Sequence, residues 1–249
     1  TTNMDSGAIA YIRQHKALGL GHAVWCAKRL VGNEPFAVIL PDDVIAAEKP
    51  CLQQMVEAYA ETGGNMVAAM EVPPEKASFY GVLDIKDDMG SLVSVKGMVE
   101  KPKKDEAPSN LAVIGRYILT PKVMANLNRM KAGAGGEIQL TDAIGEELRK
   151  SGNVYGFRFR GQRFDCGSKA GFLQATVAFG LAREDLRDEF AQYLTQMTAV
   201  QRQRLLGHAP LEAYTARTLT TLDTLEREIK RVVRDGYARD NEEFLPRLM

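Results

Sequence analysis

Two positions in this sequence place an aspartate where a strand-like segment gives way to a turn. Asp42, with Asp43 beside it, follows the apolar segment Phe36–Leu40, and Asp165 follows the alternating segment Val154–Arg160. Carboxylate oxygens are hard ligands that suit Mg²⁺, and a bound Mg²⁺ can bridge the phosphates of a ligand. The same aspartates could instead be turn residues that accept hydrogen bonds from their own backbone. The pattern is consistent with a shared metal site at Asp42 and Asp165, but spacing alone does not show that the two residues meet.

An acid and a base stand side by side after the segment Leu92–Val99. Glu100 can accept hydrogen bonds from sugar hydroxyls, and Lys101 can offset the charge of a phosphate. The alternative is a solvated ion pair on the protein surface, which is common for a lone Glu–Lys pair. Other polar groups must converge on the pair if it is to be a sugar phosphate site.

A glycine turn, Leu18–Ala23, leads into a segment with apolar residues at helical spacing. Because glycine has no Cβ, the backbone at Gly19 or Gly21 can approach a flat ring closely. Amides at the start of a helix also suit anions. Glycines that simply open a helix fit the spacing equally well, so both interpretations stay open.

Most reaction templates are missing from the sequence. It contains no GxSxG elbow, no GxGxxG fingerprint and no Walker sequence. The glycine-rich stretch Gly133–Glu137 follows no predicted strand and lacks the lysine of a phosphate loop. The three histidines and three cysteines form no HxxxH or CxxC pair, which argues against a zinc site. The reaction class that remains is metal-assisted chemistry on a phosphorylated ligand.

Composition and charge exclude further classes. The 249 residues are 45% apolar and 26% charged, which is typical of a globular chain with one large domain. The 32 basic and 32 acidic residues cancel, so no basic field indicates nucleic-acid binding. The longest apolar run, Phe36–Leu40, is too short to cross a bilayer, and the cysteine pattern fits a reducing cytosol. We expect a cytoplasmic protein without a membrane or nucleic-acid partner.

Strand-length segments recur through the first two thirds of the chain. Each is bounded by proline, glycine or charged residues, and they are Phe36–Leu40, Met66–Val72, Tyr80–Asp84, Leu92–Val99, Ala112–Leu119 and Val154–Arg160. The region from Gly81 to Leu119 is nearly all strand, which indicates that part of the sheet is antiparallel or mixed. Strands interleaved with helices predict an α/β fold, with a mixed sheet covered by helices on both faces.

Two helices are expected between these strands. Apolar residues at helical spacing run from Leu52 to Tyr59, and Thr62–Gly64 stops that helix. The pair Thr141-Asp142 can cap a second helix that runs to about Lys150, with Gly152 just past its end.

The pattern changes near Arg183. From Arg183 to Leu206 the chain is charged and helical in pattern, with no clear strand. A further helix ends at Gly236, and its apolar stripe contains Leu222, Leu225, Ile229 and Val232. We expect a mainly helical tail.

Several motifs occur in one order along the chain. They are Arg13-Gln14, Leu18–Ala23, Leu40–Asp43, Phe79–Val82, Val99–Lys103, Pro108–Tyr117, Gly135–Asp142 and Phe164–Lys169. From about residue 5 to about residue 195, this set resembles the bacterial UTP–glucose-1-phosphate uridylyltransferases (UDP-glucose pyrophosphorylases). The resemblance implies a Rossmann-like nucleotidyltransferase fold. It also implies a reaction in which glucose 1-phosphate attacks the α-phosphorus of UTP, so that UDP-glucose forms and pyrophosphate leaves.

The resemblance assigns roles to nine residues. The uracil base would be contacted by Gln14 and Gly19, and Mg²⁺ would be held by Asp42 and Asp165. The remaining five would bind the sugar phosphate: Gly81, Glu100 and Lys101 hold glucose and its phosphate, while Val113 and Glu137 line the sugar pocket. The family favours UTP over dTTP and glucose over other hexoses. Such enzymes supply positioning and charge neutralisation more than covalent help.

The sequence departs from the family pattern at its start. Family members carry a Gly-x-Gly-Thr-Arg loop and then a Pro-Lys-x-Met lysine, and neither is present here, as if the chain began a third of the way into the pattern. The loop would cradle the triphosphate, and losing even one such donor typically costs about 10²–10³ in rate. No catalytic residue is therefore assigned, and we expect this chain alone to have little or no transferase activity.

The C-terminal residues resemble a different family. Four segments are similar to part of the effector-binding domain of IclR-type transcriptional regulators, namely Arg204–Gly207, Tyr214–Thr220, Val232–Ala238 and Asp240–Glu243. The two resemblances imply a partial nucleotidyltransferase domain over residues 1–195 and an appended tail over residues 196–249. Such a chain is a fusion with its seam near residues 194–200. The alternative is that these residues form a divergent helical tail used for oligomerisation. The first resemblance also implies oligomers, because the uridylyltransferases usually form homo-oligomers.

Two functions besides the transferase stay open. A non-catalytic sugar-nucleotide binding module would keep the sugar and metal half of the site. A fragment of a fused regulatory protein would act through its tail, although zero net charge and the lack of a DNA-reading helix count against it.

Overall fold

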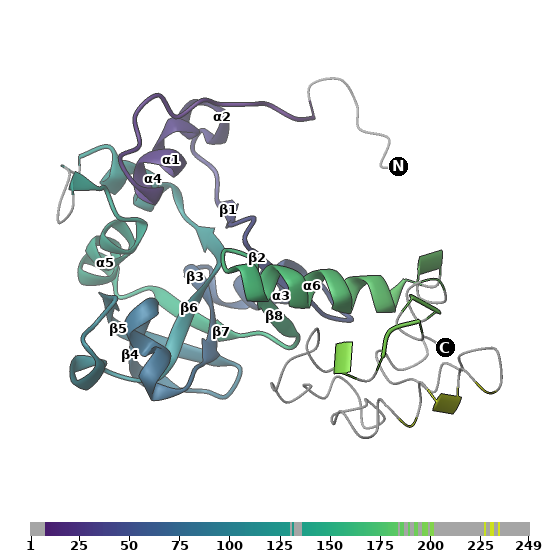
Figure 1. Ribbon diagram of the computed structural model, residues 1–249. Coiled ribbons are helices and arrows are strands. Elements are labelled where there is room, and N and C mark those ends of the chain that lie inside the picture. The colour runs from purple at the N-terminus through teal and green to yellow at the C-terminus, as the bar shows by residue number, and fades with distance from the viewer. Residues whose placement is uncertain are drawn as a thin grey trace. The chain divides into compact units, whose positions relative to one another are not determined.

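The computed structural model divides into two compact units, and each is described by itself (Figure 1). The first unit comprises Thr1–Asp43 and Lys49–Gly161, and the second comprises Val44–Glu48 and Gln162–Met249. The described residues are 8–129, 131, 136–183, 185, 186, 189, 192, 193, 196–198, 200, 201, 227, 230, 231 and 234. The four residues of the expected apolar stripe, Leu222, Leu225, Ile229 and Val232, therefore lie outside the described residues, as does most of the expected helical region from Arg183 to Leu206.

A six-stranded mixed sheet forms the centre of the first unit. In spatial order its strands are β1 (Phe36–Ile39), β6 (Leu111–Leu119), β3 (Asn65–Glu71), β7 (Val154–Arg158), β5 (Leu92–Glu100) and β4 (Gly81–Asp88). Strands β3 and β7 pair in parallel, while β1–β6, β3–β6, β5–β7 and β4–β5 are antiparallel. The predicted mixed α/β sheet is confirmed.

Helices cover both faces of this sheet. Residues 111–115 of β6 are all buried, without the alternation of a strand that has one wet face. In β3, Val67 and Ala69 pack with the apolar residues of α4 (Pro121–Leu127) and α5 (Leu140–Ser151). Successive side chains of a strand point to opposite faces, so Met66 and Ala68 are buried on the other face, where α3 (Cys51–Thr62) contacts β3 and β6.

Glycines end the two long helices as predicted. Helix α3 stops at Gly63 and α5 at Gly152, with φ of 64° and 66°. Both values lie in the left-handed region, which glycine adopts without a Cβ penalty. Shorter elements complete the unit: α1 (Leu20–Cys26), α2 (Lys28–Val31), η1 (Pro74–Phe79) and η2 (Lys104–Glu106).

The predicted start of α5 is wrong. The helix begins at Leu140 after an extended Gln139, and no side chain caps it. Asp142 lies in the first turn, where a negative charge complements the positive end of the helix. Thr141 lies in the same turn, so its side chain is available for a contact other than capping.

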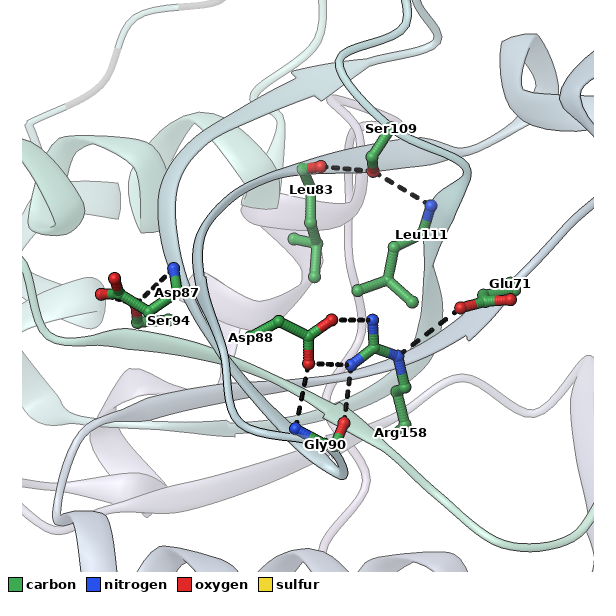
Figure 2. A network of polar contacts seen from close by, with 9 residues as sticks. All are labelled: Glu71, Leu83, Asp87, Asp88, Gly90, Ser94, Ser109, Leu111 and Arg158. Atoms are coloured by element: carbon green, nitrogen blue, oxygen red, sulfur yellow. Dashed lines mark hydrogen bonds and ion pairs between the residues drawn. The ribbon is translucent and has the colours of Figure 1, made fainter.

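Strand β4 is longer than predicted. The sequence suggested that it ends at Asp84, but it continues to Asp88 because its polar second half pairs with the start of β5 as an exposed ribbon. Figure 2 shows how the ribbon's turn is attached to β7. Arg158 forms a two-pronged ion pair with Asp88 at 2.9 and 2.8 Å, and it also donates to the carbonyl of Gly90 at 2.6 Å. Glu71 lies 3.9 Å from the Nε atom of Arg158.

The second unit contains a two-stranded sheet and a helix. Strands β2 (Asp43–Ala46) and β8 (Gln162–Asp165) pair, and α6 (Lys169–Ala182) packs its Ala175 and Ala178 on Phe164 of β8. The predicted strand Val154–Arg160 therefore ends at Arg158, and β8 is an additional element. Among the described residues, no helix has the length and apolar character needed to span a membrane.

Candidate functional site

A cavity of about 290 Å³ lies in the first unit, where strand ends meet the start of α5. Its walls come from the residues after β1, the start of β4, the end of β5, the middle of β6 and the first residues of α5. Five of the residues assigned by resemblance line it together: Asp42, Gly81, Glu100, Lys101 and Val113. Residues far apart in the sequence thus converge on one site.

Gly81 makes room in this cavity. The register of the β4–β5 pair sets it opposite Glu100. A Cβ at position 81 would lie 3.0 Å from Glu100 Oε2, 3.5 Å from Thr141 Cγ2 and 3.9 Å from Val113 Cβ. Any side chain there would crowd the Glu100 carboxylate and fill space that the cavity offers to a ligand.

Lys101 is held in an unusual backbone conformation. Its φ is 45°, the only positive φ outside glycine among the described residues. Its N–H donates to the carbonyl of Tyr80 at 3.0 Å, and its Nζ lies 3.9 Å from Glu100 Oε1. A side chain in the left-handed region costs of order 1–3 kcal/mol, and such strain clusters at ligand sites. The Glu100–Lys101 pair is thus built into a cavity wall by a strained turn.

One wall of the cavity is rich in carboxylates. Burial raises the pKa of Tyr117, and the carboxylates of Glu100, Asp43 and Asp42 raise this pKa further. The three acids therefore lie close enough to Tyr117 to affect its charge. Such a wall favours hydroxyl donors or a cation, and an anionic phosphate needs Lys101 or a metal ion beside it.

The two adjacent aspartates have different roles. Asp43 is buried, and its Oδ2 accepts a hydrogen bond from the N–H of Gly115 in β6 at 2.8 Å. The Arg116 guanidinium donates to the carbonyls of Leu40, at 2.8 Å, and of Asp43. The alternative of a structural aspartate therefore describes Asp43. Asp42 is exposed and lines the cavity, so its carboxylate is placed to meet a ligand or a metal ion.

Asp165 belongs to the second unit. Its Oδ1 accepts a hydrogen bond from the N–H of Gly167 at 3.2 Å, and its Oδ2 lies 3.8 Å from Arg163 Nη2. Its carboxylate is 45% exposed, so it is accessible to a cation. Two hard carboxylates suit Mg²⁺, which keeps several of its waters. No cluster of three or more metal-binding side chains occurs in the described part of the chain. The joint site with Asp42 stays a prediction.

The two residues assigned to the uracil base lie side by side. Gln14 Nε2 is 3.1 Å from the carbonyl oxygen of Gly19 and 2.9 Å from Nδ1 of His22. Gly19 has a φ of 89°, and a Cβ there would lie 2.9 Å from Cβ of Glu137. The close approach that this glycine allows in the structure is to the chain at Glu137 and Ile138.

Glu137 lies between the base and sugar residues rather than in the cavity wall. It accepts a hydrogen bond from Gln139 Nε2 at 2.8 Å, and Gln139 does line the cavity. Its neighbour Ile138 donates to the carbonyl of Leu18 at 2.7 Å and accepts from the N–H of Gly21 at 2.9 Å. These bonds hold the glycine turn against the residues that lead into α5.

Thr141 is a cavity residue that the sequence interpretation missed. Its Oγ1 is buried and makes no hydrogen bond with any described residue. It lies beside Gly81, and it was interpreted as a helix cap because threonine is common at that position. The helical spacing of α5 was the available signal, since Thr141 lies three residues before the buried Ile144 and seven before the buried Leu148.

These features define an α/β domain with a polar cavity near its strand ends. The Nucleotidyl transferase family model matches residues 2–180, and the chain belongs to this family. It is 45% identical over 186 residues to the UTP–glucose-1-phosphate uridylyltransferase of Bacillus subtilis, covering 75% of this chain and 63% of the relative. It is 48% identical over 170 residues to that of Komagataeibacter xylinus, covering 68% and 59%. The chain thus spans less than two thirds of the length of these relatives.

Solved structures agree with this assignment. A UDP-glucose pyrophosphorylase complexed with UDP-glucose is similar with a TM-score of 0.67 and 42% identity, covering 70% of this chain and 66% of that one. A UTP-bound UGPase from Acinetobacter baumannii has a TM-score of 0.66 and 38% identity, covering 74% and 64%. The resemblance to this family and the nucleotidyltransferase fold are confirmed.

The C-terminal resemblance is also confirmed by comparison. Residues 191–248 match the family model Bacterial transcriptional regulator IclR C-terminal. Most of these residues lie outside the described part of the chain. The expected boundary between residues 195 and 196 stays a prediction.

Proposed function

We propose that this chain carries the sugar phosphate half of a UTP–glucose-1-phosphate uridylyltransferase site. The complete reaction forms UDP-glucose and pyrophosphate from UTP and glucose 1-phosphate. The observation that carries the proposal is the convergence of Gly81, Glu100, Lys101 and Val113 on one cavity that Asp42 also lines. Relatives named for this activity, at 45% and 48% identity, support the choice of substrates.

The cavity residues have distinct tasks in this proposal. Gly81 leaves room for a hexose ring beside the carboxylate of Glu100, which accepts hydrogen bonds from the ring hydroxyls. The Lys101 ammonium offsets the phosphate charge that the carboxylate-rich wall would otherwise repel. Val113 lines the sugar pocket, and Glu137 contributes to that pocket through its hydrogen bond with Gln139, which lines the cavity. Gln14 and Gly19 contact the uracil base. These groups bind and orient the substrates, so that the reacting atoms approach in line.

Asp42 and Asp165 are the proposed ligands of Mg²⁺. Both are accessible carboxylates with the hard oxygen atoms that this ion prefers. When bound there, Mg²⁺ would neutralise charge on the nucleotide phosphates.

A non-catalytic sugar-nucleotide binding module is the second candidate. The observation that favours it is the cavity itself, in which the groups suited to a sugar phosphate, Gly81, Glu100 and Lys101, gather beside Asp42. Turnover of UTP and glucose 1-phosphate separates the two candidates, because a binding module binds UDP-glucose without turnover. We further propose that the protein is cytoplasmic and homo-oligomeric, and that it acts on neither nucleic acid nor a membrane.

Calorimetric titration of the full chain with UDP-glucose in the presence of Mg²⁺ tests the proposal. We expect binding by the parent chain and a Kd at least about tenfold higher for Lys101→Met, since a charged hydrogen bond to a phosphate is worth about 1.5–3 kcal/mol. The matched control is Lys103→Met, because Lys103 is exposed, pairs with Glu106 and does not line the cavity. No heat from the parent chain at millimolar UDP-glucose would contradict the proposed binding. The similarity to the family would then indicate common ancestry only.

A further inference from the structure

We infer that His22 is a positioning residue that fixes the hydrogen-bonding direction of the Gln14 amide, and thereby sets the preference for uracil over cytosine. This inference rests on the proposed function, in which Gln14 contacts the base. It concerns a residue to which the resemblance assigns no role.

The carbonyl of Gly19 first orients the amide. It lies 3.1 Å from one end of the Gln14 side chain, and a carbonyl oxygen only accepts hydrogen bonds. The atom that faces it must therefore be the amide nitrogen, Nε2. The same carbonyl also accepts the N–H of Ala23 at 3.2 Å, so the Gln14 amide shares this acceptor with the backbone of α1.

His22 completes the orientation. Its Nδ1 lies 2.9 Å from the same Nε2 atom of Gln14. An amide nitrogen only donates, so Nδ1 must be the unprotonated, accepting nitrogen, and the ring proton is on Nε2 of His22. Turning the Gln14 amide over would bring its oxygen against the carbonyl of Gly19 and, in this tautomer of His22, against the Nδ1 lone pair, so both hydrogen bonds would be lost.

The imidazole itself is held in place by its own helix. Trp25, three residues on in α1, stacks on it with ring centroids 5.8 Å apart and an interplanar angle of 24°. The half-buried Cys26, four residues on, has its Sγ 3.9 Å from both ring nitrogens. Asn128 of α4's C-terminal end accepts a hydrogen bond from Trp25 Nε1 at 3.0 Å, so this support extends beyond α1.

The Gln14 amide is therefore fixed in one hydrogen-bonding orientation. Both hydrogens of Nε2 are used, so the group that Gln14 can offer to a base is the acceptor Oε1, which no donor occupies within the described residues. The N3–H of uracil can donate to that oxygen. N3 of cytosine carries a lone pair instead, so the two acceptors repel. A Gln14 that could turn over would accommodate either base.

The ratio of the Kd for CDP-glucose to that for UDP-glucose, measured calorimetrically with Mg²⁺ on the full chain, tests the inference. We expect His22→Phe, which keeps a ring for stacking but has no acceptor, to lower the ratio roughly tenfold, the worth of one oriented hydrogen bond. We expect His22→Asp, whose carboxylate only accepts, to retain the parent ratio. The ratio is insensitive to a reduced fraction of folded protein and to a charge effect common to both ligands.

An unchanged ratio in His22→Phe would overturn the inference, and so would an equal fall in His22→Phe and His22→Asp, which would indicate packing alone. Long-range ¹H–¹⁵N NMR of the free chain gives a readout that needs no ligand, and with three histidines the spectrum can be assigned by variants. We expect His22 with its proton on Nε2, and a proton on Nδ1 would contradict the proposed direction. If the parent chain binds neither sugar nucleotide, the proposed function fails and this inference with it, whatever the NMR result.

Discussion

Lys101 combines backbone strain with a proposed contact to phosphate, and the two effects can be separated. Lys101→Gly and Lys101→Val both remove the ammonium, so we expect both to weaken UDP-glucose binding equally. Only valine must keep a side chain at a φ of 45°. We therefore expect Lys101→Val to unfold with a free energy about 1–2 kcal/mol lower than Lys101→Gly, measured by urea denaturation. Equal stabilities would show that the turn relaxes at no cost.

Thr141 gives a second prediction, in which stability and binding respond in opposite ways. Its hydroxyl is buried with no partner among the described residues, and an unsatisfied buried group costs about 1–3 kcal/mol. We expect Thr141→Val to leave the free energy of unfolding unchanged or to raise it, while the Kd for UDP-glucose rises roughly tenfold. Thr141→Ser is the control that keeps the hydroxyl. A loss of stability in Thr141→Val with unchanged binding would mean that the hydroxyl serves the fold.

Residue roles were predictable from the sequence only in part. The Glu100–Lys101 pair and Gly81 were assigned by resemblance to a sugar phosphate site, and they do line one cavity. The difference between Asp42 and Asp43 could not be predicted, because both follow the same strand. It depends on the N–H of Gly115, which reaches Asp43 only through the pairing of β1 with β6.

The turn that carries Asp42 depends on a glycine in β6. A Cβ at Gly115 would lie 2.6 Å from Asp43 Oδ2 and 2.7 Å from Leu40 Cβ, which is closer than atoms pack. We expect Gly115→Ala to lower the free energy of unfolding by about 1–3 kcal/mol, as overpacking does, and to weaken UDP-glucose binding. Gly145→Ala in α5 is the control, because a Cβ there meets its nearest atom only at 3.9 Å. Unaltered stability of Gly115→Ala in thermal unfolding would contradict this account of the turn.

The attachment of the β4–β5 turn to β7 should be sensitive to acid (Figure 2). The hydrogen bond from Arg158, and then that from the N–H of Gly90, lower the pKa of Asp88. A lowered pKa in the folded state means that the contribution to stability is present at neutral pH and is lost as the pH falls below about 4, through the folded pKa. We expect Asp88→Asn to be less stable than the parent chain at pH 7, and we expect this difference in stability to be smaller at pH 3. Asp87→Asn, which leaves the Arg158 pair intact, is the control for thermal unfolding at both pH values.

Strands were easier to predict than their partners. Apolar segments such as Met66–Val72 and Ala112–Leu119 are recognisable because a strand buried on both faces needs a continuous apolar run. The order of strands could not be predicted, since β3 lies between β6 and β7 through pairings distant in the sequence. The second half of β4 was missed because its polar residues are stabilised by hydrogen bonds to β5 and not by burial.

At the scale of the whole molecule, the tail is predicted to be dispensable for ligand binding. The family model for nucleotidyl transferases matches residues 2–180, and the cavity lies in the first unit. We expect a chain of residues 1–195 to bind UDP-glucose with the affinity of the full chain. Light scattering on both chains tests the alternative of an oligomerisation tail, which requires the shorter chain to lose subunits. A loss of UDP-glucose binding on deletion would show that the tail takes part in the site.

Membership of the family could be inferred from the order of motifs along the sequence, because each motif marks a strand end or helix start of one fold. The sequence also resembles a second family in its C-terminal part, and a second family model matches there. Whether Asp42 and Asp165 share one Mg²⁺ depends on how the two units are arranged, which motif order does not encode. Measuring Mn²⁺ binding by electron paramagnetic resonance in Asp42→Asn and Asp165→Asn tests it: we expect each variant to lose the same site.

A crystal structure of the full chain with UDP-glucose and Mg²⁺ tests most directly whether the cavity of the first unit is the sugar site. We predict that the hexose occupies this cavity beside Gly81, with ring hydroxyls in hydrogen-bonding distance of the Glu100 carboxylate and a phosphate oxygen near Lys101. A hexose bound elsewhere, with the cavity left to solvent, would contradict the assignment.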